Sequence, residues 1–181
     1  SISARWSPGS AVQGPRPMAR IFFASLLLIA LFMQIAVMPT IEPFRVLPSI
    51  PLVLLLVWSS IRGIREGLFW AFGLGLLYDI LALDPMGSNG LAFMGVALLG
   101  GLAARRFFSS KLIFPIALAI VATMLHGIVM LLVRNAEGGS TPIGSIIRPV
   151  FSQALLNAIL VPPCYWIAGF VGRDRMVMRH A

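Results

Sequence analysis

The side chains of this 181-residue sequence that could do chemistry are few, and they stand apart from one another in apolar surroundings. Asp79 lies roughly two-thirds of the way along one apolar run, His126 and Thr123 lie in another, and the single cysteine, Cys164, follows two prolines. A carboxylate within such a run can bind an ion, relay a proton or contact a partner. A histidine there can bind a metal or carry a proton.

The spacing of these residues does not match a catalytic motif. The sequence has no HExxH, no GxSxG, no Walker loop and no pair of carboxylates placed for a common cleft. A metal site needs several ligands, and the only other histidine, His180, is in the terminal segment. The sequence therefore predicts a protein that is not an enzyme and holds no metal or cofactor.

Asp79 has two interpretations that the sequence leaves open. It is a functional group that serves partner contact, ion binding or proton relay, or it is a structural hydrogen-bond hub. In the second case it lies near the outer boundary of its helix, beneath a loop that contains Ser88 and Asn89. A buried carboxylate in lipid costs about 2.5–3.5 kcal/mol on insertion scales, so either role requires polar neighbours.

The other polar residues inside apolar runs favour structural roles. His126 is predicted to make an interhelical hydrogen bond rather than to bind a ligand, and Gln34 is the one strongly polar residue of its run. Gln153 and Asn157 are four apart and so share a helix face. Amides on one face commonly bridge membrane helices.

The elements that must position these residues follow from composition. The chain is 59% hydrophobic and 11% charged, with a mean hydropathy of +0.94, whereas soluble domains are about 45–50% apolar and about 25% charged. A helix needs roughly 20 apolar residues to cross a bilayer. The sequence predicts an all-α integral membrane protein, a bundle of six transmembrane helices at about residues 20–38, 47–61, 67–83, 91–104, 112–133 and 146–171.

The last of these segments contains Pro162 and Pro163, which predict a kink. The alternative is a short interfacial helix over residues 143–151 that leads into a shorter span. Residues 1–17 are rich in Ser, Gly and Pro and predict a disordered tail or a segment foreign to the native chain, with a native start at Met18. The transmembrane domain is expected at 18–172, followed by a short basic cytoplasmic tail at 173–181.

The net charge of +8 follows the topology rather than nucleic-acid binding, because the basic residues are scattered between apolar runs. With six crossings and both ends inside, all but three of the 14 Lys and Arg residues lie on the inner side, as the positive-inside rule requires. The three expected outside are Arg45, Arg134 and Arg148.

One stretch is more specific than composition. A Gly-rich helix ends in an acid, and a short loop with a Pro-x-Gly element leads into the next helix. This pattern resembles the MreD family of bacterial rod shape-determining proteins. The residues that carry the resemblance are Gly67, Gly73, Gly75, Asp79, Pro85 and Gly87.

The resemblance implies a six-helix fold similar to that of the substrate-binding S-components of ECF-type vitamin transporters. It implies a non-catalytic scaffold in the bacterial cytoplasmic (inner) membrane that acts in cell elongation and peptidoglycan synthesis. The implied partners are MreC, the MreB filament system, RodA and its class B penicillin-binding protein, besides membrane lipid. Asp79 and Gly87 become structural or partner-facing positions of the motif.

Two other functions remain as alternatives. The first is an S-component that binds a vitamin. Such subunits often dock through an AxxxA pattern in the first helix, which residues 20–38 lack. The expected outer loops are also short, with little room for ligand contacts. The second is a small ion-coupled transporter that uses Asp79.

Overall fold

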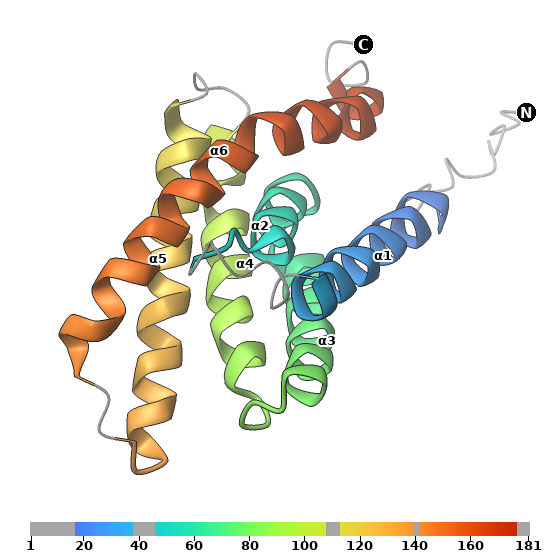
Figure 1. The fold of residues 1–181 in the computed structure, drawn as a ribbon. Helices are drawn as coiled ribbons and strands as arrows, with labels where there is room; N and C mark the ends of the chain where they lie inside the picture. Colours follow the sequence, from blue (N-terminus) through green and yellow to red (C-terminus); the bar gives the residue numbers. More distant parts are fainter. Residues whose placement is uncertain (1–16, 38–45, 108–112, 140–141, 177–181) are drawn as a thin grey trace, which may run out of the picture.

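In the computed structural model, residues 17–37, 46–107, 113–139 and 142–176 are described, and all the elements within them are helical (Figure 1). The prediction of an all-α protein is confirmed for these residues. The elements are α1 (Pro17–Phe32), the π-helical turn η1 (Met33–Val37), α2 (Ile50–Arg62), α3 (Ile64–Ala82), α4 (Ser88–Phe107), α5 (Ile113–Ala136) and α6 (Ile143–Met176).

Two helical stretches of the described chain are long and apolar enough to cross a membrane, Ile113–Ala136 and Gly144–Trp166. The stretches Arg20–Ala36, Ile50–Arg62 and Ser88–Ala104 are also apolar but shorter. With 13 residues, α2 is about 20 Å long, against a hydrocarbon core of about 30 Å. Within the described residues, length and composition therefore support two spanning helices and several shorter apolar ones.

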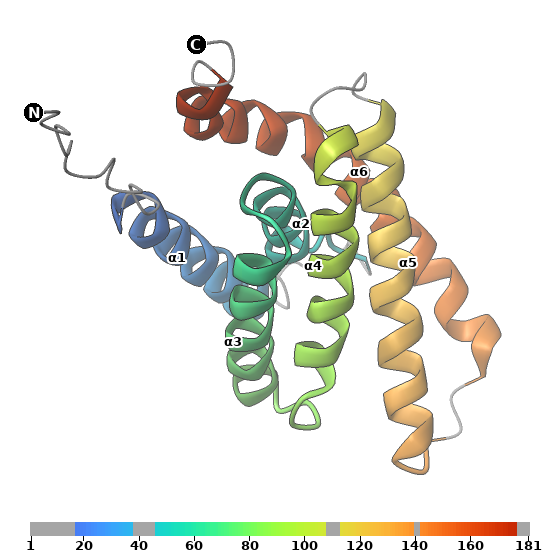
Figure 2. The ribbon, with the colours of Figure 1, turned by 180° about the vertical axis from the view of Figure 1, so that it is seen from behind.

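Helix α4 is the centre of the bundle and packs against α2, α3 and α5 (Figures 1 and 2). Two glycine contacts bring its backbone close to its neighbours. A Cβ on Gly75 of α3 would overlap the backbone of Gly90, and a Cβ on Gly100 would lie 2.7 Å from the carbonyl oxygen of Leu56. These contacts explain why small residues occupy the positions where the helices touch.

The apolar core lies where α2 meets α4, with α1, α3, α5 and α6 around it. On the α1 side, the ring of Phe23 stacks on Trp58 at a centroid distance of 3.8 Å and meets Trp70 edge-on at 5.6 Å. Aromatic contacts thus join α1 to α2 and α3.

Helix α6 is continuous over 34 residues although it contains Pro149, Pro162 and Pro163. It bends along its length, and its C-terminal half turns away from α5 (Figure 1). Prolines are the usual cause of such a bend, because each removes one backbone hydrogen bond. A separate interfacial helix over residues 143–151 is not present. The helix also includes the first residues of the expected basic tail. The rest of that tail and residues 1–16 lie outside the described residues.

The outer surface of the bundle is strongly apolar. Soluble monomers rarely expose contiguous apolar patches of more than a few hundred Å², whereas lipid requires an apolar outer face. The exposed large side chains occur on every long helix and include Phe22, Ile29, Phe32, Phe69, Phe72, Leu91, Leu102, Val121, Ile128, Leu132, Phe151, Ile159 and Trp166.

The loops divide between the two ends of the bundle. The α3–α4 and α5–α6 connections lie at the lower end in Figure 1, while the start of α1 and the end of α6 both lie at the upper end. The two hairpins α3–α4 and α5–α6 therefore point the same way.

Candidate functional site: a buried carboxylate in the α3–α4 hairpin

The candidate site lies where α3 ends and α4 begins. Asp79 is in the last turn of α3, closer to the helix end than the sequence predicted. The backbone N–H groups of Leu83 and Asp84 both donate to its carbonyl oxygen, the latter at 3.0 Å. Leu83 adopts the left-handed conformation with φ 55°. Such a cap closes the helix and turns the chain.

A tight turn then leads into α4. Ser88 N–H donates to the Pro85 carbonyl at 3.1 Å, and the Gly87 carbonyl accepts Leu91 N–H at 2.9 Å. Gly87 is therefore the N-cap of α4, since its carbonyl accepts the first intrahelical bond. Its φ of 92° is a conformation that favours glycine. A glycine, however, has no side chain to cap the free N–H groups of the first turn.

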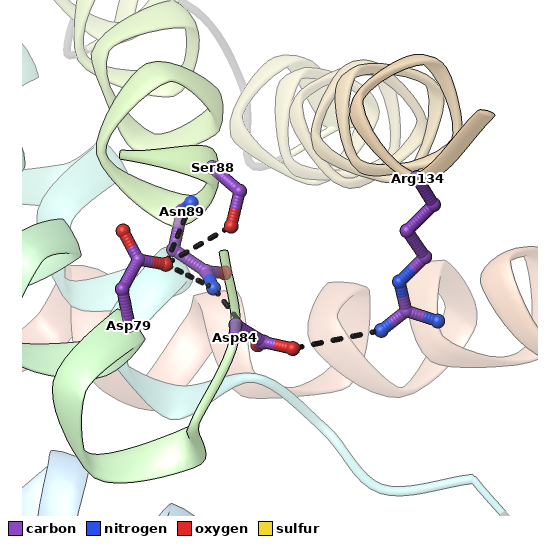
Figure 3. A network of polar contacts seen from close by, with 5 residues as sticks. All are labelled: Asp79, Asp84, Ser88, Asn89 and Arg134. Carbon is purple, nitrogen blue, oxygen red and sulfur yellow. Dashed lines mark hydrogen bonds and ion pairs between the residues drawn. The ribbon is translucent and has the colours of Figure 1, made fainter. Parts of the chain in front are cut away.

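Asp79 supplies that missing cap from the preceding helix. Its Oδ2 accepts the Gly87 N–H at 2.7 Å. Its Oδ1 accepts the Ser88 hydroxyl at 3.0 Å, the Asn89 backbone N–H at 3.0 Å and the Asn89 side-chain amide at 2.8 Å (Figure 3). The side chain is 1% exposed, so these donors replace water.

The electrostatics favour a negative charge at this position. Both carboxylate oxygens accept backbone N–H groups, which can only donate. The N-terminus of α4 also carries a partial positive charge, which stabilises a nearby anion by about 0.3–1 kcal/mol or more when partly buried. The arrangement suits an acceptor-only carboxylate, and hydrogen bonds of this kind are stronger than neutral ones.

The contacts continue outward to a third helix. Asn89 also donates its side-chain amide to Asp84 Oδ2 at 3.1 Å, and Asp84 Oδ1 lies 3.9 Å from an Arg134 guanidinium nitrogen near the end of α5 (Figure 3). We call Asp79, Asp84, Ser88, Asn89 and Arg134 the Asp79 network. The network joins the α3–α4 hairpin to α5 at one end of the bundle.

The chemistry open to Asp79 is limited by this arrangement. Its two oxygens are already occupied by four donors. Among the described residues, no group of three His, Cys, Asp or Glu side chains is placed to hold a metal ion. The geometry thus matches the hub interpretation of Asp79 more closely than the ion-binding or proton-relay interpretation.

The motif glycines divide into two kinds. Gly75 lies against the Gly90 backbone, and Gly67 lies against the Ser59 side chain on α2, so both are used for contacts inside the bundle. Gly73 is exposed, and a Cβ added to it would meet nothing within 4 Å. The structure therefore brings Gly67 and Gly75 into the core and places Gly73 on the outer face.

A second polar junction joins α6 to α2 and α5. The fully buried Asn157 accepts the Ser49 backbone N–H at 2.7 Å and donates to Thr123 Oγ1 at 2.9 Å. One turn earlier, the Gln153 amide donates to the Leu47 carbonyl at 3.2 Å. Both amides therefore bridge elements distant in sequence, as their shared face predicted.

His126 and Gln34 do not join either polar cluster. The ring of His126 lies 5.0 Å from that of Phe93, and no hydrogen-bond partner for its buried Nε2 is present among the described residues. The interhelical hydrogen bond predicted for His126 is not seen at this atom. Gln34 lies in η1, and its Oε1 is likewise buried without a partner in the described part of the chain.

Sequence reasoning did not predict the outer part of the Asp79 network. Asp84 and Arg134 are separated by 50 positions, and nothing local to either residue predicts their pairing. Ser49 was also missed, although a Ser just before an apolar run with a proline in its first turn is a recognised sign of a helix start. Its contribution here is its backbone N–H rather than its hydroxyl.

Comparison with family models matches residues 17–170, nearly the whole chain, to the rod shape-determining protein MreD. Comparison with curated proteins and with solved structures finds no match, so the resemblance to ECF-type S-components stays a prediction. The family is a membrane-associated, shape-determining one and is not known for catalysis. The family match, the apolar outer surface and the Gly-rich hairpin ending at Asp79 agree: the chain belongs to the MreD family of rod shape-determining proteins.

Proposed function

We propose that this protein is a non-catalytic, multi-pass membrane scaffold of the cell-elongation complex. It docks the single transmembrane helix of MreC and, through it, is linked to the MreB filament system and to RodA with its class B penicillin-binding protein. The family match supports the general role in rod shape. The particular linkage to MreC is supported by the outer face of α3.

Placement in the cytoplasmic membrane with six crossings is part of the proposal. It is supported by the exposed apolar side chains on all the long helices and by the two helices of sufficient length. It is also supported by the two hairpins, whose loops lie at one end while the ends of the described chain lie at the other (Figure 1). With both termini inside, the Asp79 network lies at the outer boundary.

The observation that carries the docking proposal is the outer face of α3. Phe69, Phe72, Gly73 and Ile80 are exposed and recur at helical spacing, so they form one apolar stripe. Within the described chain, α3 packs mainly against α2 and α4 and meets α1 at Glu66 and Trp70, and this stripe lies on its exposed side. Gly73 leaves room at its centre for a helix backbone, as small residues do in membrane helix pairs.

Asp79 has an indirect part in this docking. Its carboxylate is 1% exposed and cannot form a broad contact with a partner. It fixes α3 against α4 through the four hydrogen bonds at the hairpin. A rigid face loses less entropy on binding than a mobile one, so the hub favours association.

The test is co-purification of the full chain with full-length MreC, using Gly73→Leu. Apart from the backbone of its own helix, a Cβ here meets no atom of the described residues within 4 Å, and the change removes a helix glycine, so the isolated variant should be as stable as the wild type or more so. We expect MreC association to fall about tenfold or more, because the leucine keeps the partner backbone away.

The matched control is Ala117→Leu, an equally small-to-large change at an exposed position of α5. It should leave the complex intact. Full retention of MreC by Gly73→Leu, with the control behaving the same, would rule out this face as the docking site.

A further inference from the structure

An apolar groove lies between α5 and α6, on the part of the bundle away from the α3 stripe. It encloses a volume of about 210 Å³. It lies between the two helical stretches that are long and apolar enough to span a membrane. The residues that line it are Met124, Gly127, Ile128, Leu131, Ile146, Ile147, Val150 and Phe151.

The groove has a clear structural cause. The two helices touch where Gly127 meets Val150, since a Cβ on Gly127 would lie 2.8 Å from both methyl groups of that valine. Larger side chains next to this contact, among them Ile128 and Phe151, line the groove. The lining from Met124 to Leu131 follows α5 for about 10 Å. The lining residues of this slot are all apolar, as an acyl chain requires.

Arg148 is three residues from the lining residue Phe151, so the two are neighbours on the surface of α6. Arg148 lies in the sequence between two lining residues, Ile147 and Val150, and its side chain is exposed. Arg148 forms no ion pair with a described residue, whereas Arg20 pairs with Glu66 and Arg134 with Asp84. In the proposed topology Arg148 is close to the outer membrane–water boundary, at the level of lipid headgroups.

We propose that this groove binds an anionic phospholipid, with one acyl chain in the slot and the headgroup phosphate on Arg148. An exposed arginine is a strong ligand for phosphate. A partner helix fits the slot less well, because its one small residue, Gly127, is already covered by Val150. The inference rests on the proposed membrane placement but not on the docking of MreC.

The experiment measures lipid binding to the purified full chain in detergent by native mass spectrometry. The probes are dioleoyl phosphatidylglycerol, which is anionic, and dioleoyl phosphatidylcholine, which has the same chains and no net charge. Arg148→Gln removes the charge, and Ile128→Trp adds bulk to the slot. Their matched controls are Arg65→Gln on α3 and Leu102→Trp on α4, both exposed and remote from the groove.

We expect the wild type to bind phosphatidylglycerol about tenfold more tightly than phosphatidylcholine, because the choline cation of the second lipid offsets the attraction between its phosphate and Arg148. Arg148→Gln should abolish that preference, and Ile128→Trp should weaken both lipids. Neither control should change binding. Because Arg148 is on the surface, its variant should fold normally even if the tryptophan variant does not.

Equal binding of the two lipids by the wild type, or equal effects of Arg148→Gln and Arg65→Gln, would overturn the proposal. So would a photo-crosslinker at position 128 that captures a polypeptide in cells instead of lipid. The lipid titration needs no partner protein. The two proposals can therefore fail separately. The lipid site can be refuted while MreC docking still depends on Gly73, and MreC docking can be refuted while the lipid site holds.

Discussion

The replacement Asp79→Ala tests whether the carboxylate is a structural hub. It removes the acceptor of four hydrogen bonds. In the variant the Ser88 hydroxyl can rotate to another acceptor, and the Asn89 side-chain amide keeps its hydrogen bond to Asp84. The donors left without an acceptor are therefore the backbone N–H groups of Gly87 and Asn89. A buried donor left without a partner costs about 1–3 kcal/mol. Since Gly87 is only half-buried, we expect a loss of about 3 kcal/mol in the free energy of unfolding.

The measurement is thermal unfolding of the isolated protein in detergent, followed by circular dichroism. At about 2–4 °C per kcal/mol for a chain of this size, the melting temperature should fall by roughly 6–12 °C. The matched control is Asp84→Ala, five residues later. Asp84 accepts one side-chain hydrogen bond and meets Arg134 at 3.9 Å, where the arginine side chain is 54% exposed. Such a pair contributes about 0–1 kcal/mol.

Equal losses in the two variants would refute the reasoning, because the hub argument depends on the difference between their hydrogen bonds. An unchanged melting temperature for Asp79→Ala, together with lost MreC binding, would also refute it. That result would return Asp79 to the role of a direct partner contact.

Three further predictions concern the isolated protein in the same melting assay. Gly75→Ala should lower the free energy of unfolding by about 1–3 kcal/mol, since the added Cβ overlaps the Gly90 backbone. Gly73→Ala should be neutral or raise the free energy of unfolding by up to about 1 kcal/mol. Equal effects of the two changes would argue against the close approach of α3 and α4. Asn157→Leu should cost about 1–3 kcal/mol, because it leaves the Ser49 N–H without its acceptor, and a stable variant would show that this contact is dispensable. His126→Phe should be neutral or stabilising, since it removes a buried nitrogen that has no partner among the described residues. A marked loss of stability would contradict this and show that His126 makes a stabilising contact.

The helices could be predicted from sequence because hydropathy and turn residues act locally. Pro51 marks the first turn of α2, and the dense turn residues after Ala82 mark the α3–α4 loop. The start of α3 at Ile64, three residues earlier than expected, could not be predicted that way. Gly63 turns the chain with φ 93°, and Arg65 and Glu66 then continue as helix although their charges suggested a loop.

The candidate site was predictable only in its local part. Asp79, Ser88 and Asn89 are near in sequence, so a loop folded back on the acid was a reasonable hypothesis. The sequence did not predict why the loop folds back on Asp79, because the reason is that Gly87 is an N-cap without a side chain. The contact of Asn157 with Ser49 spans 108 positions, and no local pattern encodes which helix an amide will face. Tertiary packing decides such pairs.

The two neighbouring glycines of α3 show how the site and the outer face are connected. A glycine in a helix interior costs roughly 0.5–1 kcal/mol relative to alanine. At Gly75 that cost is offset inside the chain, because it allows the backbone of α3 to approach Gly90, next to the residues that bind Asp79. At Gly73 no atom of the described chain takes the space that the missing side chain leaves.

The compensation for Gly73 therefore has to come from outside the described residues. A lipid tail gains little from a missing side chain, since it adapts to any apolar surface, whereas a helix backbone gains close contact. The Asp79 network holds α3 at a fixed position against α4, so Gly73 is presented on a rigid face. In the proposed docking, the buried acid and the exposed glycine serve the same association of α3 with MreC. Asp79→Ala and Gly73→Leu should therefore both weaken MreC binding, while only the first lowers stability.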